Sequence, residues 1–272
     1  MHQERWFSIY FESFYGIREI PNEHEWTENL EKVSLMLNES SYIPLNMCPN
    51  CLNLTTLMIQ RNSRLTQIPS CFFANMQGPK VLTLSKTSIE SLPNSIFNLE
   101  NLTTLLLFYC TRLKHMPCLA KLKALKKLKL YETRIEVVPE GIEMLVNLQY
   151  LDLWCRDLVQ LSTRILNNLS DLQHLVVYWE STTLRIKGEE VTKLKKFGIF
   201  KAQLYDLQDL NNYVKSNHVK RLSDYMLVVG QVEEAFDHVF SNKTIRLREC
   251  EIGQEDSVVL LADMHELWIY QC

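Results

Sequence analysis

One apolar pattern recurs along most of the chain and constrains its fold more than any other feature. It reads LxxLxL in its clearest copies, which are Leu54–Ile59, Leu102–Leu107 and Leu148–Leu153. With weaker copies included there are eleven units, and the central apolar residues, 20 to 28 positions apart, are Val33, Leu57, Leu82, Leu105, Leu128, Leu151, Leu175, Phe197, Tyr225, Ile245 and Leu267. A period of about 20–29 residues indicates one small structural unit stacked on the next. The sequence therefore predicts a solenoid of about eleven repeats.

Side-chain alternation explains the LxL core of each unit. In a short strand the two apolar residues face the interior and the middle residue faces solvent. Stacked units align these strands into one parallel sheet on the concave face of a curved solenoid. A second motif, LxxLP, ends at Pro69, Pro93, Pro117 and Pro139, where proline suits the connection that leaves the sheet. The predicted class is α/β, with the parallel sheet on the concave face.

The repeats do not account equally well for every part of the chain. Residues 1–26 form a short N-terminal segment of uncertain structure, and residues 27–272 form the repeat domain. Regular geometry is expected to about residue 178. Beyond it the repeats are irregular, with an insertion at about 205–220 that has a helix-like polar pattern.

Charge and hydropathy exclude two classes of partner. The formal net charge is −3, whereas nucleic-acid-binding domains usually carry a basic excess. No apolar run approaches the roughly 18 residues that a membrane-spanning helix needs. The N-terminus offers no secretory signal either, because Glu12 interrupts its short apolar run. We therefore expect no nucleic acid, no membrane span and a cytoplasmic location.

The eight cysteines are scattered through a long chain, which favours thiols over a disulfide framework. Cys48 and Cys51 form a CxxC pair, but no second pair of ligands follows at a zinc-site spacing. They are predicted to be loop cysteines. Cys110, Cys250 and Cys272 occupy the position where each unit turns inward, at which other units have asparagine or threonine. No metal site is predicted.

The full repeat, LxxLxLxxCxxLxxLP, resembles the plant intracellular class of leucine-rich repeats. The strings Gly16–Pro21, Glu25–Met36 and Gly188–Lys196 are similar to the repeat region of coiled-coil, nucleotide-binding plant disease-resistance receptors. The resemblance covers about residues 16–272. It implies a recognition module that binds a pathogen effector or a guarded host protein and restrains a nucleotide-binding domain. That domain is absent from this chain, because no GxxxxGK[ST] phosphate loop occurs and no cofactor is expected.

Two other functions remain open beside an immune receptor. The repeats could select substrates for a ubiquitin ligase, although residues 1–26 are too short and too aromatic for an F-box. They could also come from a cell-surface receptor, against which stand the 23-residue steps between several units and the LP ending. No enzyme is expected. The sequence contains neither GxSxG nor HExxH, and no catalytic residues are assigned.

The candidate binding site is a column of aromatic residues. Alternation places the residue after each LxL on the concave, solvent side. In five consecutive units this residue is aromatic: Phe108, Tyr131, Trp154, Tyr178 and Phe200. Exposed aromatics in one stripe favour contact with a protein partner, and the alternative is cross-strand stacking that stiffens the sheet. Lys127 and Lys129 point to the same face and would contribute to binding an acidic partner.

Overall fold

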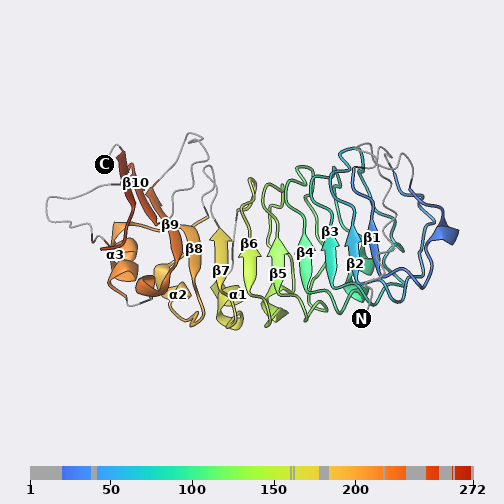
Figure 1. The fold of residues 1–272 in the computed structure, drawn as a ribbon. Helices are drawn as coiled ribbons and strands as arrows, with labels where there is room; N and C mark the ends of the chain where they lie inside the picture. The colour runs from blue at the N-terminus through green and yellow to red at the C-terminus, as the bar shows by residue number, and fades with distance from the viewer. Residues whose placement is uncertain are drawn as a thin grey trace.

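Eleven strands lie side by side in one parallel sheet, in the order in which they occur in the chain (Figure 1). The computed structural model describes residues 20–37, 42–159, 161, 163–177, 184–216, 218–230, 243–250, 259 and 261–270. The strands are β1 (Lys32–Ser34), β2 (Thr56–Met58), β3 (Val81–Thr83), β4 (Thr104–Leu106), β5 (Lys127–Lys129), β6 (Tyr150–Asp152), β7 (His174–Val177), β8 (Ile199–Leu204), β9 (Asp224–Gly230), β10 (Thr244–Arg248) and β11 (Glu266–Tyr270). The predicted solenoid of eleven repeats with a parallel sheet is confirmed.

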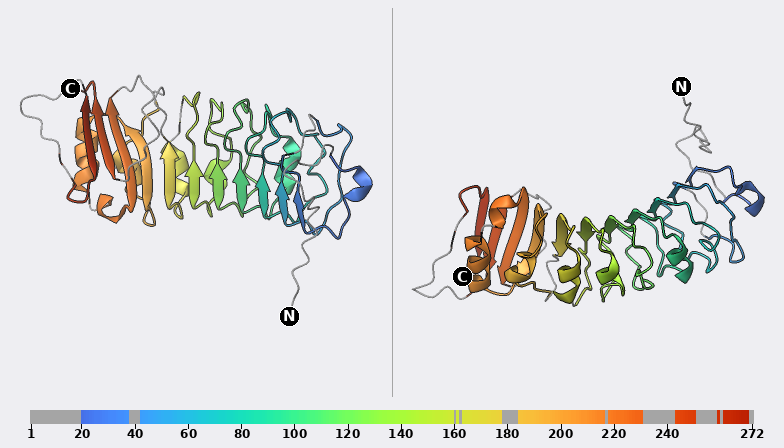
Figure 2. Two further views of the ribbon diagram at one scale, coloured as in Figure 1. Left: turned by 45° about the horizontal axis from the view of Figure 1, so that its top comes forward. Right: turned by 90° about the horizontal axis from the view of Figure 1, so that it is seen from below.

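Short helices lie mainly on the side of the molecule opposite to the sheet, while η1 (Glu23–Glu25) lies at the N-terminal end of the row beyond β1, and the row of strands is curved (Figure 2). The short helices are the 3-10 helices η1, η2 (Asn94–Asn98), η3 (Ile142–Met144) and η4 (Val219–Arg221), and the α-helices α1 (Thr163–Asn168), α2 (Gly188–Val191) and α3 (Leu207–Lys215). α3 lies where the helix-like pattern was predicted, and the Asp206 side chain caps it by accepting from the backbone N–H of Asp209 at 2.7 Å.

The core is a stack of leucine layers, one for each position of the LxL motif. Leu105, Leu128 and Leu151 are aligned strand by strand, and all three are fully buried. The second apolar position is buried in the same way, as at Leu107 and Leu130. Each layer contacts only its neighbours, which is how a repeat too small to bury its own apolar face becomes stable.

Behind the sheet, polar side chains in the turns satisfy the strand-end carbonyls. Thr87 Oγ1 donates to the Leu84 carbonyl at 2.8 Å, and Cys110 Sγ donates to the same oxygen at 3.1 Å from the next repeat. Thr133 and Cys155 repeat this arrangement at the Leu130 carbonyl. Burial raises the pKa of the Cys110 and Cys155 thiols, so both are structural hydrogen-bonding groups rather than reactive ones. Cys110 therefore fills the inward turn as predicted.

The turn that precedes each of these polar side chains has a left-handed backbone in the first repeats. Five structurally equivalent residues have positive φ without being glycine: Leu37, Arg61, Lys86, Tyr109 and Glu132. Each N–H pairs with the next strand, as Tyr109 does with the Tyr131 carbonyl at 2.7 Å. The sixth repeat lacks this turn residue, so that Cys155 follows Trp154 directly. Cys155 still donates to the Leu130 carbonyl, as the equivalent cysteine Cys110 does to Leu84.

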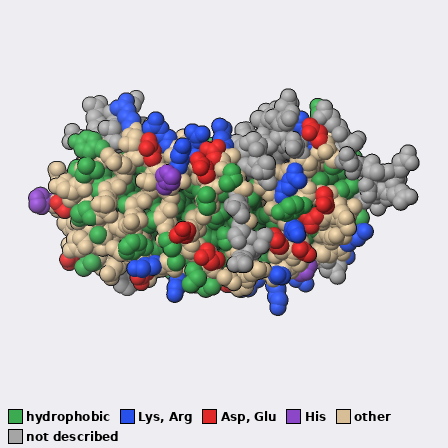
Figure 3. All heavy atoms as spheres, turned by 180° about the vertical axis from the view of Figure 1, so that it is seen from behind, with side chains coloured by type: hydrophobic (Ala, Val, Ile, Leu, Met, Phe, Trp, Pro, Cys, Tyr) green, Lys and Arg blue, Asp and Glu red, His purple; other side chains and the backbone are tan. Residues whose placement is uncertain are grey.

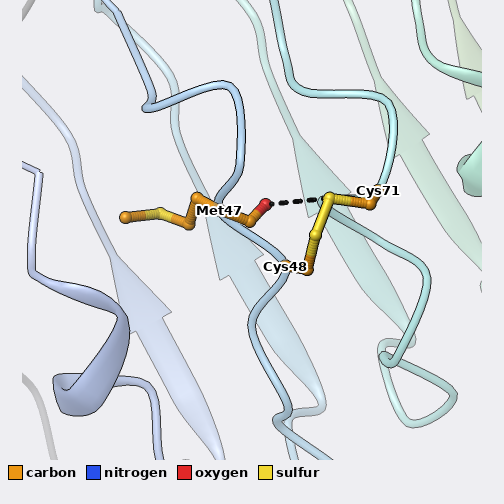
Figure 4. The surroundings of a disulfide bond; sticks show 3 residues. All are labelled: Met47, Cys48 and Cys71. Carbon is orange, nitrogen blue, oxygen red and sulfur yellow. Dashed lines mark hydrogen bonds between the residues drawn. A yellow bond between two sulfur atoms is a disulfide. The ribbon is translucent and has the colours of Figure 1, made fainter.

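The cysteines of the first two connections, β1 to β2 and β2 to β3, correct one prediction. Cys48 and Cys71 are joined by a disulfide, with Cα atoms 5.2 Å apart and a sequence separation of 23 (Figure 4). The Met47 carbonyl oxygen lies 3.5 Å from Cys71 Sγ. The prediction that both are thiols is wrong, because one repeat step places them over one another on adjacent units. Cys51, by contrast, is a buried free thiol.

Candidate functional site

Three columns of side chains cover the open face of the sheet, because alternate residues of aligned strands project to the same side. On β5 to β7 the first column contains Lys127, Tyr150 and His174, and the second contains Lys129, Asp152 and Val176. The third column follows each second core residue and contains Phe108, Tyr131 and Trp154 on consecutive repeats. The predicted placement of these last three on the concave face follows from this register.

A continuous path of aromatic rings crosses β4 to β6. Tyr109 and Tyr131 have ring centroids 5.0 Å apart, and Tyr131 and Trp154 are 5.2 Å apart, both edge to face. Phe108 joins the path through Tyr109 at 6.2 Å. Such edge-to-face pairs add about 0.5–1.5 kcal/mol beyond the area that they bury. The rings are therefore held in fixed positions before any partner arrives.

Sequence reasoning missed Tyr109, which is 41% exposed at the turn after β4. Strict alternation would point the residue after Phe108 toward the core. The left-handed backbone, with φ of 59°, turns it outward instead. Its hydroxyl donates to the Tyr131 hydroxyl at 3.3 Å. The sequence signal that could have identified Tyr109 was the presence of two adjacent aromatic residues, Phe108 and Tyr109, where the chain leaves the strand.

Trp154 lies on the predicted face but is not exposed as predicted, since only 8% of it is accessible. It belongs to a small cluster on the sheet surface with Val176, Met226 and Val228, separate from the leucine core, and Tyr131 packs against it. The longer strands β7 to β9 bring these apolar side chains beside it. Trp154 therefore anchors the aromatic path, and the more open members are Phe108, Tyr109 and Tyr131.

Phe200 was assigned to the wrong face. It pairs with Leu175 and Tyr225 in the sheet, is fully buried, and packs on Phe197 and Tyr213 in the core. The predicted unit began three residues early, at Leu194, whereas β8 begins at Ile199. Gln203 occupies the concave position instead. Tyr178 lies outside the described residues.

Lys127 and Lys129 reach over the aromatic rings of the same face. Lys127 Nζ lies 4.5 Å from the Tyr150 ring centroid. Lys129 Nζ lies 5.3 Å from the Phe108 ring and 5.6 Å from the Tyr131 ring. At these distances each ammonium is attracted by the ring's electron density. On the turn, the exposed Lys86 covers the Tyr109 ring at 5.4 Å. The site is a mixed lysine–aromatic surface.

Two titratable groups lie beside these rings: Asp152, which is buried, and His174, which is partly buried. Burial raises the pKa of Asp152 from 3.8 to about 6, against the lowering effect of Lys129, whose Nζ lies 3.8 Å from its carboxylate. Burial and the nearby Lys201 lower the pKa of His174 from 6.5 to about 4. His174 stacks on Tyr150 with centroids 3.8 Å apart. Beside it, Lys201 and Asp224 form an ion pair at 2.8 Å.

Asp152 and His174 should act on stability in opposite directions. The folded state binds the Asp152 proton more tightly than the unfolded state does, so this group stabilises the fold as pH falls from 6 to 3.8. The folded state resists protonating His174, so stability is lost as pH falls from 6.5 to 4.

We expect two single substitutions to separate these effects. Relative to the wild type, Asp152→Asn should lose stability as pH falls toward 4, because it removes the stabilising effect of protonating Asp152. His174→Gln should gain up to about 3 kcal/mol relative to the wild type over the same range, because it removes the cost of protonating His174 in the folded state. Urea unfolding in small pH steps measures both changes. If, as pH falls, both variants gained stability relative to the wild type, or both lost it, the assignment of opposite pKa shifts to Asp152 and His174 would be contradicted.

Within the described part of the chain, no group of three or more His, Cys, Asp or Glu side chains could hold a metal ion. What the surface offers instead is ring edges, hydroxyl groups and ammonium groups held on a rigid sheet. This arrangement is suited to contact with another macromolecule.

Comparison with known proteins agrees with this picture. A family model described as a leucine-rich repeat region matches residues 29–237. Disease resistance protein At4g27190 of Arabidopsis thaliana is 29% identical over 226 residues, which cover 79% of this chain and 23% of that protein. Disease resistance protein RFL1 of the same plant is 34% identical over 178 residues, covering 64% of this chain and 19% of RFL1.

A solved structure shares the fold at low sequence identity. The functional domain of InlJ from Listeria monocytogenes, which includes a cysteine ladder, superposes with a TM-score of 0.62 at 14% identity. The match covers 94% of this chain and 47% of that one. The plant relatives are much longer, since this chain spans less than a quarter of At4g27190 or RFL1.

Proposed function

This chain belongs to the leucine-rich-repeat family, and from that premise we propose that it is the protein-recognition region of a plant disease-resistance receptor. The observation that carries the proposal is the rigid path Phe108–Tyr109–Tyr131 on the open face of the sheet, partly accessible and bordered by lysines. Large aromatic side chains that are already ordered bind partners at low entropic cost. The function is binding, and no reaction is assigned to it.

The resemblance to disease resistance proteins supports a specific role for this surface. The partner would be a pathogen effector or a guarded host protein, and the repeats would restrain a nucleotide-binding domain of the same receptor. The proposed location is the cytoplasm. In the described part of the chain no helix is both long and apolar enough to span a membrane.

A photo-crosslinking amino acid at Tyr131 tests where a partner binds. In infected plant tissue we expect an adduct from Tyr131. We expect none from Val137, which is 66% exposed on the connection between β5 and β6. For the protein identified in the adduct, Tyr131→Ala should weaken binding by about 2 kcal/mol, or about 30-fold. Val137→Ala should leave binding unchanged. Adducts confined to Val137, or none at either position, would rule the concave site out.

The disulfide favours a second candidate, a receptor whose repeats lie outside the cell. Disulfides persist in oxidising compartments and are rare in the cytosol. The Cys48–Cys71 bond closes a loop of 23 residues between neighbouring repeats, which would stabilise the oxidised protein by about 3 kcal/mol.

Thiol trapping distinguishes the two locations. Protein from native tissue, blocked at once with N-ethylmaleimide, should carry the label on Cys48 and Cys71 if it is cytoplasmic. A linked Cys48–Cys71 peptide in the same digest would favour the outside location. Cys118 is exposed and free, so its label serves as the positive control for access of the reagent.

A further inference from the structure

We propose that the concave surface from β3 to β6 recognises an acidic protein segment, one that places carboxylates beside an apolar or aromatic side chain. This inference rests on the proposed function and names the chemistry of the partner. Its starting point is the set of side chains defined here as the patch: Lys86, Phe108, Tyr109, Lys127, Lys129 and Tyr131.

The ammonium groups of the patch are held in place by the rings beneath them. Lys129 lies over both Phe108 and Tyr131, and Lys86 lies over Tyr109. A cation over a ring face keeps N–H groups free to donate outward, because the ring occupies only one side of it. The patch therefore presents ordered donors next to exposed ring edges.

The positive charge of the patch is only partly cancelled on its own face. Over β2 to β6, all of whose residues the structure describes, the one carboxylate that alternation directs to this face is Asp152, which lies 3.8 Å from Lys129 Nζ. Asp152 is only 4% exposed, and burial raises its pKa to about 6. Glu132, in the turn after β5, pairs with Arg156 at 3.8 Å. The patch therefore has three ammonium groups, of Lys86, Lys127 and Lys129, beside these two carboxylates. On the opposite side of the molecule, by contrast, acidic and basic side chains are interspersed (Figure 3).

The patch ends abruptly beyond β6. The next lysine on this face, Lys201, is only 12% exposed at its side chain and is paired with Asp224 at 2.8 Å. Trp154 and its neighbours form the apolar cluster between them. That cluster is buried, so a bound segment would meet the ammonium groups together with the partly exposed rings of Phe108, Tyr109 and Tyr131 over β4 and β5. This mixture matches a segment with both acidic and apolar residues.

The geometry favours a peptide over a single-stranded nucleic acid, the other anionic polymer. Bases bind to such surfaces by stacking on open aromatic faces. Here Lys129 lies over a face of Phe108 and of Tyr131, and Lys86 lies over a face of Tyr109. Ring edges and hydroxyl groups remain, and these suit carboxylates and apolar side chains.

Selection from a displayed library of random peptides of about 12 residues tests the inference on the full chain. We expect the enriched peptides to be acidic and to contain an aromatic residue. Their affinity should fall about tenfold or more when Lys127→Gln and Lys129→Gln are combined, and it should fall as salt is raised. The matched control combines Lys114→Gln and Lys123→Gln, two exposed lysines on the connection between β4 and β5. It should bind like the wild type, and thermal unfolding of both variants checks their folding.

Each other outcome has a distinct meaning. Enriched peptides with no acidic bias that still depend on Tyr131 would overturn the acidic-partner inference and leave the proposed function standing. Enriched peptides that do not depend on Tyr131 or Phe108, or no enrichment, would count against both. Oligouridine RNA is the probe for a nucleic-acid site. If it bound more tightly than any peptide, and if that binding were lost when Lys127→Gln and Lys129→Gln are combined, the patch would be a nucleic-acid site instead.

Discussion

Replacing Leu105 by alanine is expected to lower the free energy of unfolding by about 2–5 kcal/mol. Leu105 is fully buried between Leu82 and Leu128 of the adjacent repeats, so the substitution leaves a cavity within a stack of leucines. Urea unfolding monitored by circular dichroism measures the change.

The next residue provides the control. Leu106 carries the same side chain on the same strand but faces the open side of the sheet and is only partly buried. Leu106→Ala should cost about 1 kcal/mol or less, because water can occupy the vacated space. Equal losses for Leu105→Ala and Leu106→Ala would show that the strand does not alternate as described.

The second large effect is expected at Gly141, where alanine should cost about 3 kcal/mol. Gly141 has φ of 82°, and left-handed backbone costs about 1–2 kcal/mol for a residue with a Cβ. An added Cβ would also lie 2.4 Å from the backbone nitrogen of Ala120, which cannot move aside as a side chain would. The substitution therefore shifts the connection before η3 against the preceding repeat.

Gly198→Ala is the matched control for Gly141→Ala. The nearest atoms to a Cβ at Gly198 are 3.8 Å away, which is ordinary contact, and its backbone is not left-handed. Its effect should stay within about 1 kcal/mol. Thermal unfolding of the two variants side by side measures the difference, and a loss at Gly198 as large as that at Gly141 would contradict the explanation.

The repeat pattern predicted the sheet because each unit of LxxLxL both sets the period and chooses the buried face. The failure at Phe200 has a local cause. Leu194-x-x-Phe197-x-Ile199 and Phe197-x-x-Phe200-x-Ala202 both fit an apolar LxxLxL template, three residues apart. Apolar periodicity alone cannot choose between them. The choice is made by packing, since β8 buries Phe200 against Tyr213 of α3.

The candidate site was predictable in outline but not in its members. Alternation placed Phe108, Tyr131, Lys127 and Lys129 on the open face, while the burial of Trp154 depends on Val176, Met226 and Val228 from more distant strands. Whether the patch binds a partner stays a prediction. The disulfide had a usable signal, because Cys48 and Cys71 are 23 residues apart, which is one repeat step.

The left-handed turn after the first five strands bears on how such a surface can change over generations. Its shape is set by backbone hydrogen bonds to the next repeat and by the buried polar side chains that follow it, such as Thr87 and Thr133. The side chain of the turn residue itself takes part in neither. Leucine, arginine, lysine, tyrosine and glutamate all occupy this one position in successive repeats. A single codon change there alters the chemistry along one edge of the sheet while the scaffold keeps its form. These turns give the chain a row of independently variable positions beside its aromatic path.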